Sequence, residues 1–323
     1  MAGLFITSSR IGDAVMTLSL LEGLRAQSPD MRYVVAADPL VASLFHDDPA
    51  CDGIVLFPKR KASLHWFHLW RHAVMQPWDW VADTRGSIIA YALCAKKRYI
   101  WRKKPHDQQH KVAQVSAIAG LAPSCPRIHV SAERKLRMRA LLPDTPLVVV
   151  APVANWIGKQ WPMEHFLSTI ARFCETYPDA HVLIIAAPSE DAQLKPLRGL
   201  PATRITFSTD LAKQHTLSLI DMAALMSHGS LFLGNDSGLM HMSYALAVPV
   251  IGLFGPSRDA IYGPYPATGA GHTVLRIPQS YDELSHMPGF SHKKQMCYMD
   301  GLTTDMVWQA LAEKWEKKPP RLI

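Results

Sequence analysis

The sequence predicts an α/β protein built from two similar halves, each with a mainly parallel β-sheet and helices on both faces. Short apolar runs of strand length alternate with segments of helical periodicity, which is the pattern of βαβ units. This alternation stops at a polar, proline-bearing stretch at residues 142–146 and then starts again. The chain of 323 residues is long enough for two cores, since single cores stop growing at about 250–300 residues.

The first half contains four apolar runs that are expected to form strands. Residues 11–26 carry alanine and leucine at helical spacing, and residues 39–45 are expected to form a short helix. The expected strands are residues 3–7, 32–36, 53–57 and 80–83.

The second half repeats the pattern and ends in an amphipathic segment at residues 303–317, which is expected to form a final helix. The expected strands are residues 147–151, 181–187, 230–234 and 249–254, and the other expected helices are residues 162–177, 217–226 and 239–247.

Composition limits the classes of protein to which the chain can belong. Hydrophobic residues make up 48% and charged residues 19%, which excludes a disordered chain and a fibrous one. The formal net charge of +7 favours an anionic partner. Nucleic acid, an anionic membrane surface and a phosphorylated substrate all remain open on this ground.

Cysteine usage and the N-terminal segment indicate a cytoplasmic protein. The five cysteines are scattered without a C-x-x-C pair, which argues against a disulfide framework or a zinc site. The first apolar stretch turns polar at residues 7–10 and is too short for the core of a signal peptide. No run of about 18 apolar residues is present, so we expect no membrane-spanning helix.

The most informative segment is a strand, a turn and a helix expected at residues 231–241. Asp236 and Ser237 fall in the turn, where Ser237 is a favourable N-cap residue and Gly238 lets a ligand approach the backbone. The N–H groups and the dipole of the following helix are suited to a diphosphate. From the turn alone, an ordinary capped helix with a structural His241 is an equally good interpretation.

This segment and its continuation resemble the signature of glycosyltransferase family 9, the bacterial lipopolysaccharide heptosyltransferases. The resemblance runs from Asn235 through the strand and Gly-Pro-Ser turn at residues 249–257. Residues 152–162, which end in Lys-Gln-Trp-Pro, and residues 187–190 resemble further family segments. The resemblance implies a nucleotide-sugar donor, ADP-heptose in the first place, bound in the second half. It assigns the donor to Lys159, Glu190, Leu217, Asp236, Ser237, Gly238, Leu239 and His241.

Two of these assignments keep a structural alternative. Lys159 follows the first strand of the second half, where a cation suits a diphosphate. Without the neighbouring Trp161 and Pro162, however, an ordinary solvated lysine is the favoured interpretation. Glu190 is explained about equally well as a solvated glutamate that opens a helix.

The segment after the first strand resembles the family's Ser-Ser-x-x-Gly-Asp element, whose aspartate is the proposed general base. Asp13 takes that role by match. A carboxylate can accept the proton of a sugar hydroxyl as the new C–O bond forms, and a single displacement inverts the anomeric carbon. The alternative is an acidic residue stabilised by the helix dipole. The resemblance assigns the acceptor to Ser9, Arg10, Gly12, Arg60, Lys61 and Arg85.

Two basic clusters lie in the first half, at residues 59–61 and 96–104, with an aromatic stretch at residues 65–71 between them. The resemblance implies an anionic lipid-linked or oligosaccharide acceptor, which the first cluster is suited to hold. Cations interleaved with aromatic rings also suit the inner membrane surface, so a peripheral position on its cytoplasmic face is a further expectation. The alternative is a solvated basic face.

The resemblance extends from residue 3 to about residue 312 and implies a GT-B type architecture, with two Rossmann-like domains whose parallel sheets face across a cleft. We expect an acceptor-binding domain at residues 1–143 and a nucleotide-sugar-binding domain at residues 144–302. A C-terminal helix at residues 303–323 is expected to pack back on the N-terminal domain.

No metal and no cofactor are expected. The charge of the leaving nucleoside diphosphate is met by Lys159 and the helix N-terminus. Many relatives carry further cysteines just before the position of Cys297, and this chain lacks them. A metal or redox role is therefore not transferred to Cys297.

Three other functions are weighed against this one. A family 9-like enzyme could transfer another nucleotide sugar, such as one of N-acetylglucosamine. A nucleic-acid-binding protein fits the charge, but no reading helix, zinc motif or RNA-binding signature is present, so no nucleic-acid partner is expected. An oxidoreductase is disfavoured because no G-x-G-x-x-G follows the first strand.

Overall fold

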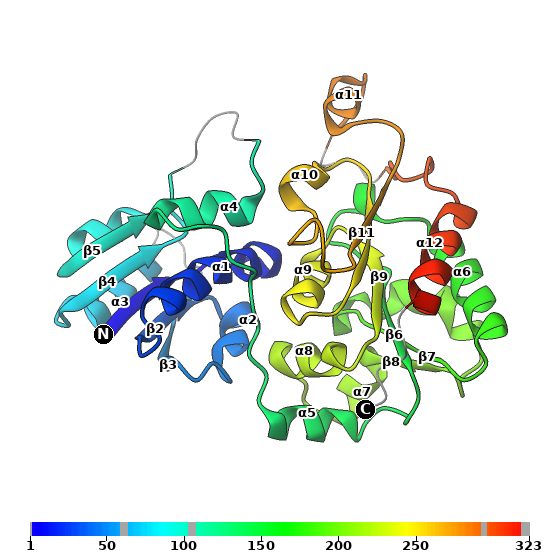
Figure 1. Ribbon diagram of the computed structural model, residues 1–323, viewed down its shortest axis with the longest axis horizontal. Coiled ribbons are helices and arrows are strands. Elements are labelled where there is room, and N and C mark those ends of the chain that lie inside the picture. The colour runs from blue at the N-terminus through cyan, green and yellow to red at the C-terminus, as the bar shows by residue number, and fades with distance from the viewer. Residues whose placement is uncertain (1, 59–63, 103–107, 292–295, 318–323) are drawn as a thin grey trace. The chain divides into compact units, whose positions relative to one another are not determined.

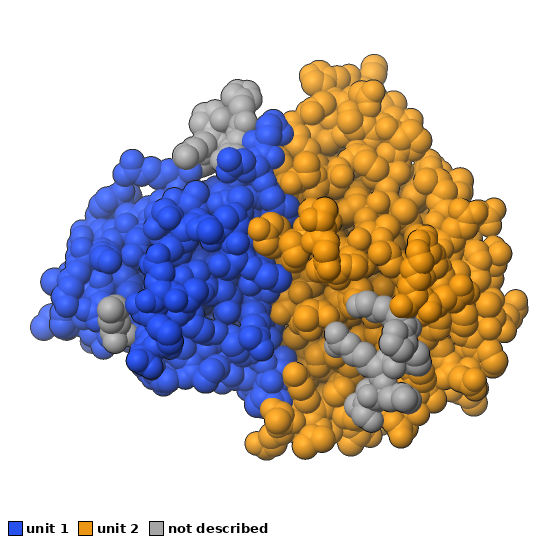
Figure 2. All heavy atoms as spheres, in the orientation of Figure 1, with its two compact units in different colours: residues 1–131 blue, residues 132–323 orange. Residues whose placement is uncertain are grey.

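The computed structural model forms two compact units, residues 1–131 and 132–323, which Figure 2 shows in different colours. Each unit contains one parallel sheet with helices packed against it, which confirms the expected α/β class. The structure describes residues 2–58, 64–102, 108–291 and 296–317.

Unit 1 contains a five-stranded parallel sheet. Its strands are β1 (Ala2–Ile6), β2 (Arg32–Ala37), β3 (Cys51–Leu56), β4 (Trp78–Asp83) and β5 (Ala95–Ile100), in the order β3-β2-β1-β4-β5 (Figure 1). β1 is central because Leu4, Phe5 and Ile6 are apolar and fully buried, as in a strand covered on both faces. The described helices are α1 (Ile11–Gln27), α2 (Pro39–Ala42), α3 (Leu64–Ala73) and α4 (Lys111–Ser116), with 3₁₀ turns at Ser43–Phe45, Ile88–Ala92 and Ala117–Ala119.

The basic stretch at residues 96–104 begins as the edge strand β5, which pairs only with β4. Charged side chains on an edge strand discourage pairing with another chain. The guanidinium of Arg98 donates hydrogen bonds to the backbone oxygens of Ala90, Leu93 and Ala95. Part of this basic cluster is therefore engaged in the fold itself.

Unit 2 contains a six-stranded parallel sheet. Its strands are β6 (Leu147–Ala151), β7 (His181–Ile184), β8 (Ile205–Phe207), β9 (Leu231–Asn235), β10 (Val250–Phe254) and β11 (Thr273–Arg276). Across the sheet they follow the order β8-β7-β6-β9-β10-β11, which is the 3-2-1-4-5-6 order of dinucleotide-binding folds.

The described helices of unit 2 include two long ones, one after β6 and one at the C-terminal end. They are α5 (Ala132–Arg139), α6 (Met163–Thr176), α7 (Ser208–Gln214), α8 (Leu219–Ser227), α9 (Gly238–Ala245), α10 (Asp259–Tyr262), α11 (Tyr281–His286) and α12 (Thr304–Lys317), with 3₁₀ segments at Ile157–Lys159 and Pro188–Gly199. Throughout the described ranges, no helix combines the length and the hydropathy needed to cross a membrane.

The helices at the two ends of unit 2 pack within that unit. The indole of Trp315 on α12 meets the ring of Phe173 on α6 edge-on, with 4.9 Å between ring centroids. This contact of α12 with α6 belongs to the core of unit 2, and the expected packing of α12 on the N-terminal domain stays a prediction. At the other end, α5 packs against α8, where Arg134 is ion-paired with Asp221. The division into units thus falls after residue 131, ahead of the expected boundary at residue 143.

Three strands have no counterpart among the expected ones: β5, β8 and β11. All three are edge strands. β5 is rich in charged residues, and β8 and β11 contain only three and four residues. None of them has the continuous apolar run that marks a buried central strand.

The strand order determines where each unit can bind a ligand. The chain leaves the sheet in opposite directions after β1 and β4 in unit 1, and after β6 and β9 in unit 2. Loops that follow such neighbouring strands diverge and leave a crevice at the carboxyl edge of the sheet. The motifs singled out in the sequence follow these same strands.

Burial of a histidine gives the stability of unit 2 a defined pH dependence. His181 on β7 is 6% exposed, and its Nε2 lies 2.9 Å from the Thr206 hydroxyl oxygen. Burial and the nearby Arg204 cation lower the pKa of His181 from 6.5 to about 4. Between these values the unfolded chain binds more protons than the folded chain. The stability of the folded state is therefore lost as the pH falls from 6.5 towards 4.

We expect His181→Gln to flatten this dependence. One pKa unit corresponds to about 1.36 kcal/mol, so the histidine accounts for about 3 kcal/mol of the stability lost on acidification. Urea unfolding of wild type and variant at neutral and acid pH measures the difference. His286→Gln, at an exposed position, is the control and should keep the wild-type slope. An equally steep slope in His181→Gln would contradict the assignment.

Candidate functional site

The turn between β9 and α9 places an acidic side chain at the carboxyl edge of the unit 2 sheet. β9 ends at Asn235, Asp236 is 5% exposed, and α9 begins at Gly238. The backbone N–H of Asp236 donates to the oxygen of Leu253 on β10 at 3.1 Å, which extends the pairing of the strands by one residue. The strand, turn and helix lie where the sequence predicts them.

Lys159 brings a cation to this turn from the loop after β6. Its ammonium group is ion-paired with the Asp236 carboxylate. The lysine side chain is 25% exposed and the aspartate side chain 4% exposed. Two predicted site residues that are 77 positions apart in the chain therefore meet, and the Lys159 side chain remains partly exposed beside the turn.

Asn235 fixes the loop after β6 to the end of β9. The residue is fully buried, and its Oδ1 accepts a hydrogen bond from the backbone N–H of Trp161 at 3.0 Å. Its Nδ2 donates to the backbone oxygen of Pro152 at 2.8 Å. One side chain thus holds both ends of the loop that carries Lys159. Loss of this amide would leave two buried backbone groups unpaired, which is costly.

A segment at residues 297–302 supports the same loop from the C-terminal part of the unit. The backbone N–H of Tyr298 donates to the oxygen of Gly158 at 3.3 Å. The indole N–H of Trp161 donates to the oxygen of Leu302 at 2.7 Å. The loop is therefore tied to two other segments before any ligand binds, and a preorganised loop loses less entropy on binding.

The Cys297 thiol takes part in this support and has a structural role. Its Sγ donates to the backbone oxygen of Gln160 at 3.3 Å. Burial raises the pKa of Cys297, which keeps the thiol protonated and unreactive.

The start of α9 presents polar groups that a ligand can use. The first N–H groups of a helix have no acceptor within the helix. Ser237 holds the expected N-cap position, but its side chain makes no cap hydrogen bond. Its Oγ, like that of Ser257 after β10, is buried without a hydrogen-bond partner in the described structure. Hydroxyl and N–H donors beside an ammonium group suit a phosphate or a carboxylate.

His241 faces the acidic residue of the turn. It lies in the first turn of α9 and is 4% exposed, with its Nε2 3.8 Å from Oδ1 of Asp236. Its Nδ1 lies 3.2 Å from the Tyr244 hydroxyl. Asp236 therefore has Lys159 on one carboxylate oxygen and His241 near the other.

The remaining predicted donor residues lie on neighbouring elements. Glu190 accepts a hydrogen bond from the backbone N–H of Ala187 at 2.8 Å. This contact fits the alternative interpretation of Glu190 as a glutamate that opens a helix. Leu217 is half-buried just before α8, and Leu239 is half-buried in the first turn of α9.

In unit 1, the carboxyl edge of the sheet carries a carboxylate. Asp13 lies half-buried in the first turn of α1. Among the described residues, its carboxylate has no hydrogen-bond or ion-pair partner. A carboxylate without a partner has free lone pairs, so the Asp13 side chain can accept a hydrogen bond and a proton from a ligand hydroxyl.

The predicted acceptor residues divide between described and undescribed parts of the chain. Ser9 and Gly12 are half-buried at the start of α1, and Arg10 is exposed at its N-cap position. Arg60 and Lys61 lie outside the described residues.

The loop after β4 is organised by the fully buried Asp83. Its carboxylate accepts hydrogen bonds from the backbone N–H groups of Arg85, Gly86 and Ser87 at 2.7–3.1 Å and from the Ser87 hydroxyl. Burial raises the pKa of Asp83 against the opposing effect of these hydrogen bonds. Gly86 has a φ of +69°, and a Cβ there would lie 2.5 Å from the oxygen of Trp101, so the turn requires glycine.

This turn presents the guanidinium of Arg85 against two aromatic rings. The guanidinium carbon lies 5.1 Å from the ring centroid of Phe57 and 4.7 Å from that of Trp66. Burial lowers the pKa of Arg85 without removing its charge. Thr84 donates its backbone N–H and its hydroxyl to the oxygen of Ile6, each at 3.0 Å, which ties the turn to the end of β1.

The two carboxyl edges can therefore perform different chemistry. The edge of unit 2 offers an ammonium, hydroxyl groups and a helix N-terminus, which suit a diphosphate. The edge of unit 1 offers a carboxylate base and a stacked guanidinium, which suit a hydroxyl and an anion. Sequence reasoning gave no role to Asn235 and Asp83, although a polar residue at the end of an apolar strand is a usable signal for both.

Comparison with known proteins agrees with this arrangement. Residues 82–282, more than half of the chain, match the model of "Glycosyltransferase family 9 (heptosyltransferase)". Lipopolysaccharide heptosyltransferase 1 of Pseudomonas aeruginosa is 28% identical over 123 residues. That stretch spans 38% of this chain and about a third, 32%, of the length of the relative.

Solved structures show the same fold over nearly the whole chain. A family 9 glycosyl transferase from Veillonella parvula superposes with a TM-score of 0.79 at 18% identity, covering 98% of this chain and 97% of that one. The E. coli ADP-heptose lps heptosyltransferase II gives a TM-score of 0.75 at 17% identity, covering 98% and 99%. These likenesses confirm the GT-B type fold.

The role of Asn235 is testable by truncation. We expect Asn235→Ala to lower the free energy of unfolding by about 2–4 kcal/mol, because two buried backbone groups lose their partners. Chemical denaturation measures the loss. Asn155→Ala, at an exposed position of the same loop, is the matched control and should change stability by less than about 0.5 kcal/mol. Equal stabilities of the two variants would show that the amide does not hold the loop.

Proposed function

The chain belongs to glycosyltransferase family 9, and on that premise we propose that it transfers a heptose, with inversion, from ADP-heptose to the inner core of lipopolysaccharide or a related glycan. The observation that carries the proposal is the meeting of Lys159, Asp236 and the N-terminus of α9 at the carboxyl edge of the unit 2 sheet. ADP-heptose is preferred as donor because a structural neighbour that shares the fold is named for it.

The donor diphosphate is assigned to the start of α9. Backbone N–H groups near Gly238 and Leu239 and the hydroxyl of Ser237 donate to phosphate oxygens, and the Lys159 ammonium neutralises their charge. As the glycosidic bond to the diphosphate breaks, the leaving oxygen gains negative charge, which these groups stabilise. No residue has to move a proton to this leaving group, because a nucleoside diphosphate leaves as an anion.

Asp236 serves this site as a positioning residue. Its carboxylate is itself anionic, so it acts on the donor through the ion pair that orients the Lys159 ammonium. His241, 3.8 Å from the other carboxylate oxygen, supports that orientation. Glu190 and Leu217, on the loops after β7 and before α8, are assigned to the nucleoside part of the donor.

Asp13 is assigned as the general base. Its carboxylate, unpaired among the described residues, accepts the proton of the attacking sugar hydroxyl while that oxygen forms its bond to the anomeric carbon. One displacement with no covalent intermediate inverts the configuration at that carbon.

The acceptor is assigned to unit 1 and is expected to be anionic. Arg85, stacked on Phe57 and Trp66, offers a guanidinium of fixed orientation, which binds carboxylates and phosphates through two parallel hydrogen bonds. Ser9, Arg10, Gly12, Arg60 and Lys61 are assigned to the same acceptor.

A peripheral contact with the inner membrane surface is part of the proposal. Unit 1 exposes large apolar side chains on and after α3 and in the following 3₁₀ turn, at 53–89% of their surface. They are Phe67, Met75, Ile88 and Tyr91. Apolar side chains next to basic residues suit the interface of an anionic membrane.

We expect Asp13→Asn to lower the transfer rate at least about 100-fold, because the amide cannot accept the proton. ADP binding should be unchanged, since the donor is assigned to unit 2. A coupled assay of ADP release measures the rate, and calorimetry measures ADP affinity. Asp30→Asn, at an exposed position of unit 1, is the matched control. Near-normal turnover in Asp13→Asn would refute the base.

We expect Lys159→Met to weaken ADP binding roughly 10- to 100-fold, as loss of a hydrogen bond to a charged group implies. Calorimetric titration without added metal measures the affinity. Lys195→Met, an exposed lysine of the same unit, should bind ADP like the wild type. Unchanged ADP affinity in Lys159→Met would remove the proposed diphosphate site. Tighter binding of UDP than of ADP would favour transfer of another nucleotide sugar.

A further inference from the structure

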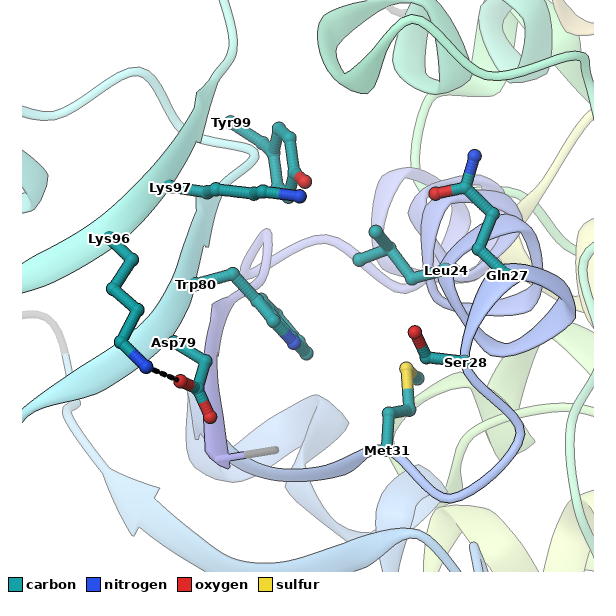
Figure 3. Close-up of a pocket in the computed structure, with 9 residues that line it drawn as sticks. All are labelled: Leu24, Gln27, Ser28, Met31, Asp79, Trp80, Lys96, Lys97 and Tyr99. Atoms are coloured by element: carbon teal, nitrogen blue, oxygen red, sulfur yellow. Dashed lines mark hydrogen bonds and ion pairs between the residues drawn. The ribbon is translucent and has the colours of Figure 1, made fainter.

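A cavity of about 350 Å³ lies within unit 1. The C-terminal end of α1 forms one wall, and residues of β4 and β5 form the other (Figure 3). This volume falls at the lower end of the range for small-molecule sites, about 300–1,000 Å³. All of the residues that line it belong to unit 1, so the cavity is a property of that unit alone.

The floor of the cavity is apolar. Trp80 is 4% exposed, and a Cβ at Gly3 would lie 2.0 Å from its ring, so the glycine lets the indole lie across β1. Leu24 and Met31, 6% and 2% exposed, face the same space. Figure 3 shows the indole between these side chains and β5.

The rim of the cavity is basic. Lys97 and Tyr99 are two positions apart on β5 and therefore lie on the same face, and both side chains extend from the strand towards α1 in Figure 3. Among the described residues, no ion pair compensates the charge of Lys97. The adjacent Lys96 is already ion-paired with Asp79 at 2.7 Å. One ammonium and one phenol hydroxyl thus border an apolar floor.

This cavity is separate from the proposed catalytic edge. Asp13 and Leu24 are eleven positions apart on α1, which corresponds to about 16 Å along a helix. Of the lining residues on β4 and β5, Asp79, Trp80, Lys96 and Lys97 lie in the first half of their strand, and Tyr99 lies nearer the carboxyl edge that carries Asp13 and the Asp83 turn.

We propose that this cavity is a second binding site, which takes a small amphipathic anion with a carboxylate or phosphate head and an acyl chain. The head binds the Lys97 ammonium and the Tyr99 hydroxyl, and the chain lies against Trp80, Leu24 and Met31. Nothing in the transfer of a sugar requires such a site, so the inference stands apart from the proposed function.

The chemistry of the walls selects this class of ligand. A sugar would bring several hydroxyl groups against the apolar side chains of Leu24 and Met31, where they would stay unpaired. A cationic amphiphile would meet the uncompensated charge of Lys97. An inorganic anion would leave the apolar floor unused. An anionic head with a single apolar chain satisfies both parts of the cavity.

Calorimetric titration with sodium decanoate, below its micelle-forming concentration, tests the proposal. Wild-type protein should bind decanoate, and Lys97→Met should bind it at least tenfold more weakly. Lys195→Met, in unit 2, should match the wild type. Gln27→Trp, an exposed position on α1 that borders the cavity, should block the chain and also abolish binding. ADP affinity should stay unchanged in all of these variants, which separates a failure here from a failure of the donor site.

Three results would overturn the proposal: no decanoate binding by the wild type, equal affinity in Lys97→Met, or equal binding of decyltrimethylammonium, which has the same chain with a cationic head. Sedimentation with phosphatidylglycerol vesicles distinguishes the source of the ligand. Co-sedimentation that decanoate competes away assigns the chain to a bilayer lipid. Decanoate binding without co-sedimentation assigns it to a free acid.

Discussion

The two hydrogen bonds of the buried Asn235 amide are the constraint on which the unit 2 site depends. They join the end of β9 to both ends of the loop after β6, which brings Lys159 beside Asp236. The parallel strand order places the two loops next to each other, and the amide fixes their relative position. The ammonium is thus held before a ligand arrives, so binding does not have to order the loop.

Much of the fold follows from the sequence because central strands carry a strong signal. β6 matches its expected range, Leu147–Ala151, since five consecutive apolar residues are fully enclosed. The edge strands β5, β8 and β11 could not be predicted from apolar runs. One side of each has no partner strand, so charged residues or a short length there lower the stability of the sheet little. The contact of α12 with α6 could not be predicted either, because an amphipathic pattern gives the buried face of a helix but not the element that covers it.

The candidate site is predictable where chemistry and spacing coincide, as at Lys159 and Asp236. The hydrogen bonds that each polar loop side chain makes are less predictable. Glu190 accepts from a backbone N–H of its own turn, and Ser237 holds an N-cap position without making the cap hydrogen bond. Such hydrogen bonds depend on the detailed geometry of the loop, which no spacing in the sequence specifies. Asn235 is the converse case, a residue with no catalytic chemistry whose contacts decide where the cation lies.

The proposed transfer can be tested by using NMR to determine the anomeric configuration of the product formed from ADP-heptose and an inner-core lipopolysaccharide acceptor. We expect transfer of the heptose with configuration opposite to that of the donor, because a single displacement assisted by Asp13 leads to one inversion. Retention of configuration would contradict the single displacement. Transfer from UDP-N-acetylglucosamine with none from ADP-heptose would contradict the assignment of the donor.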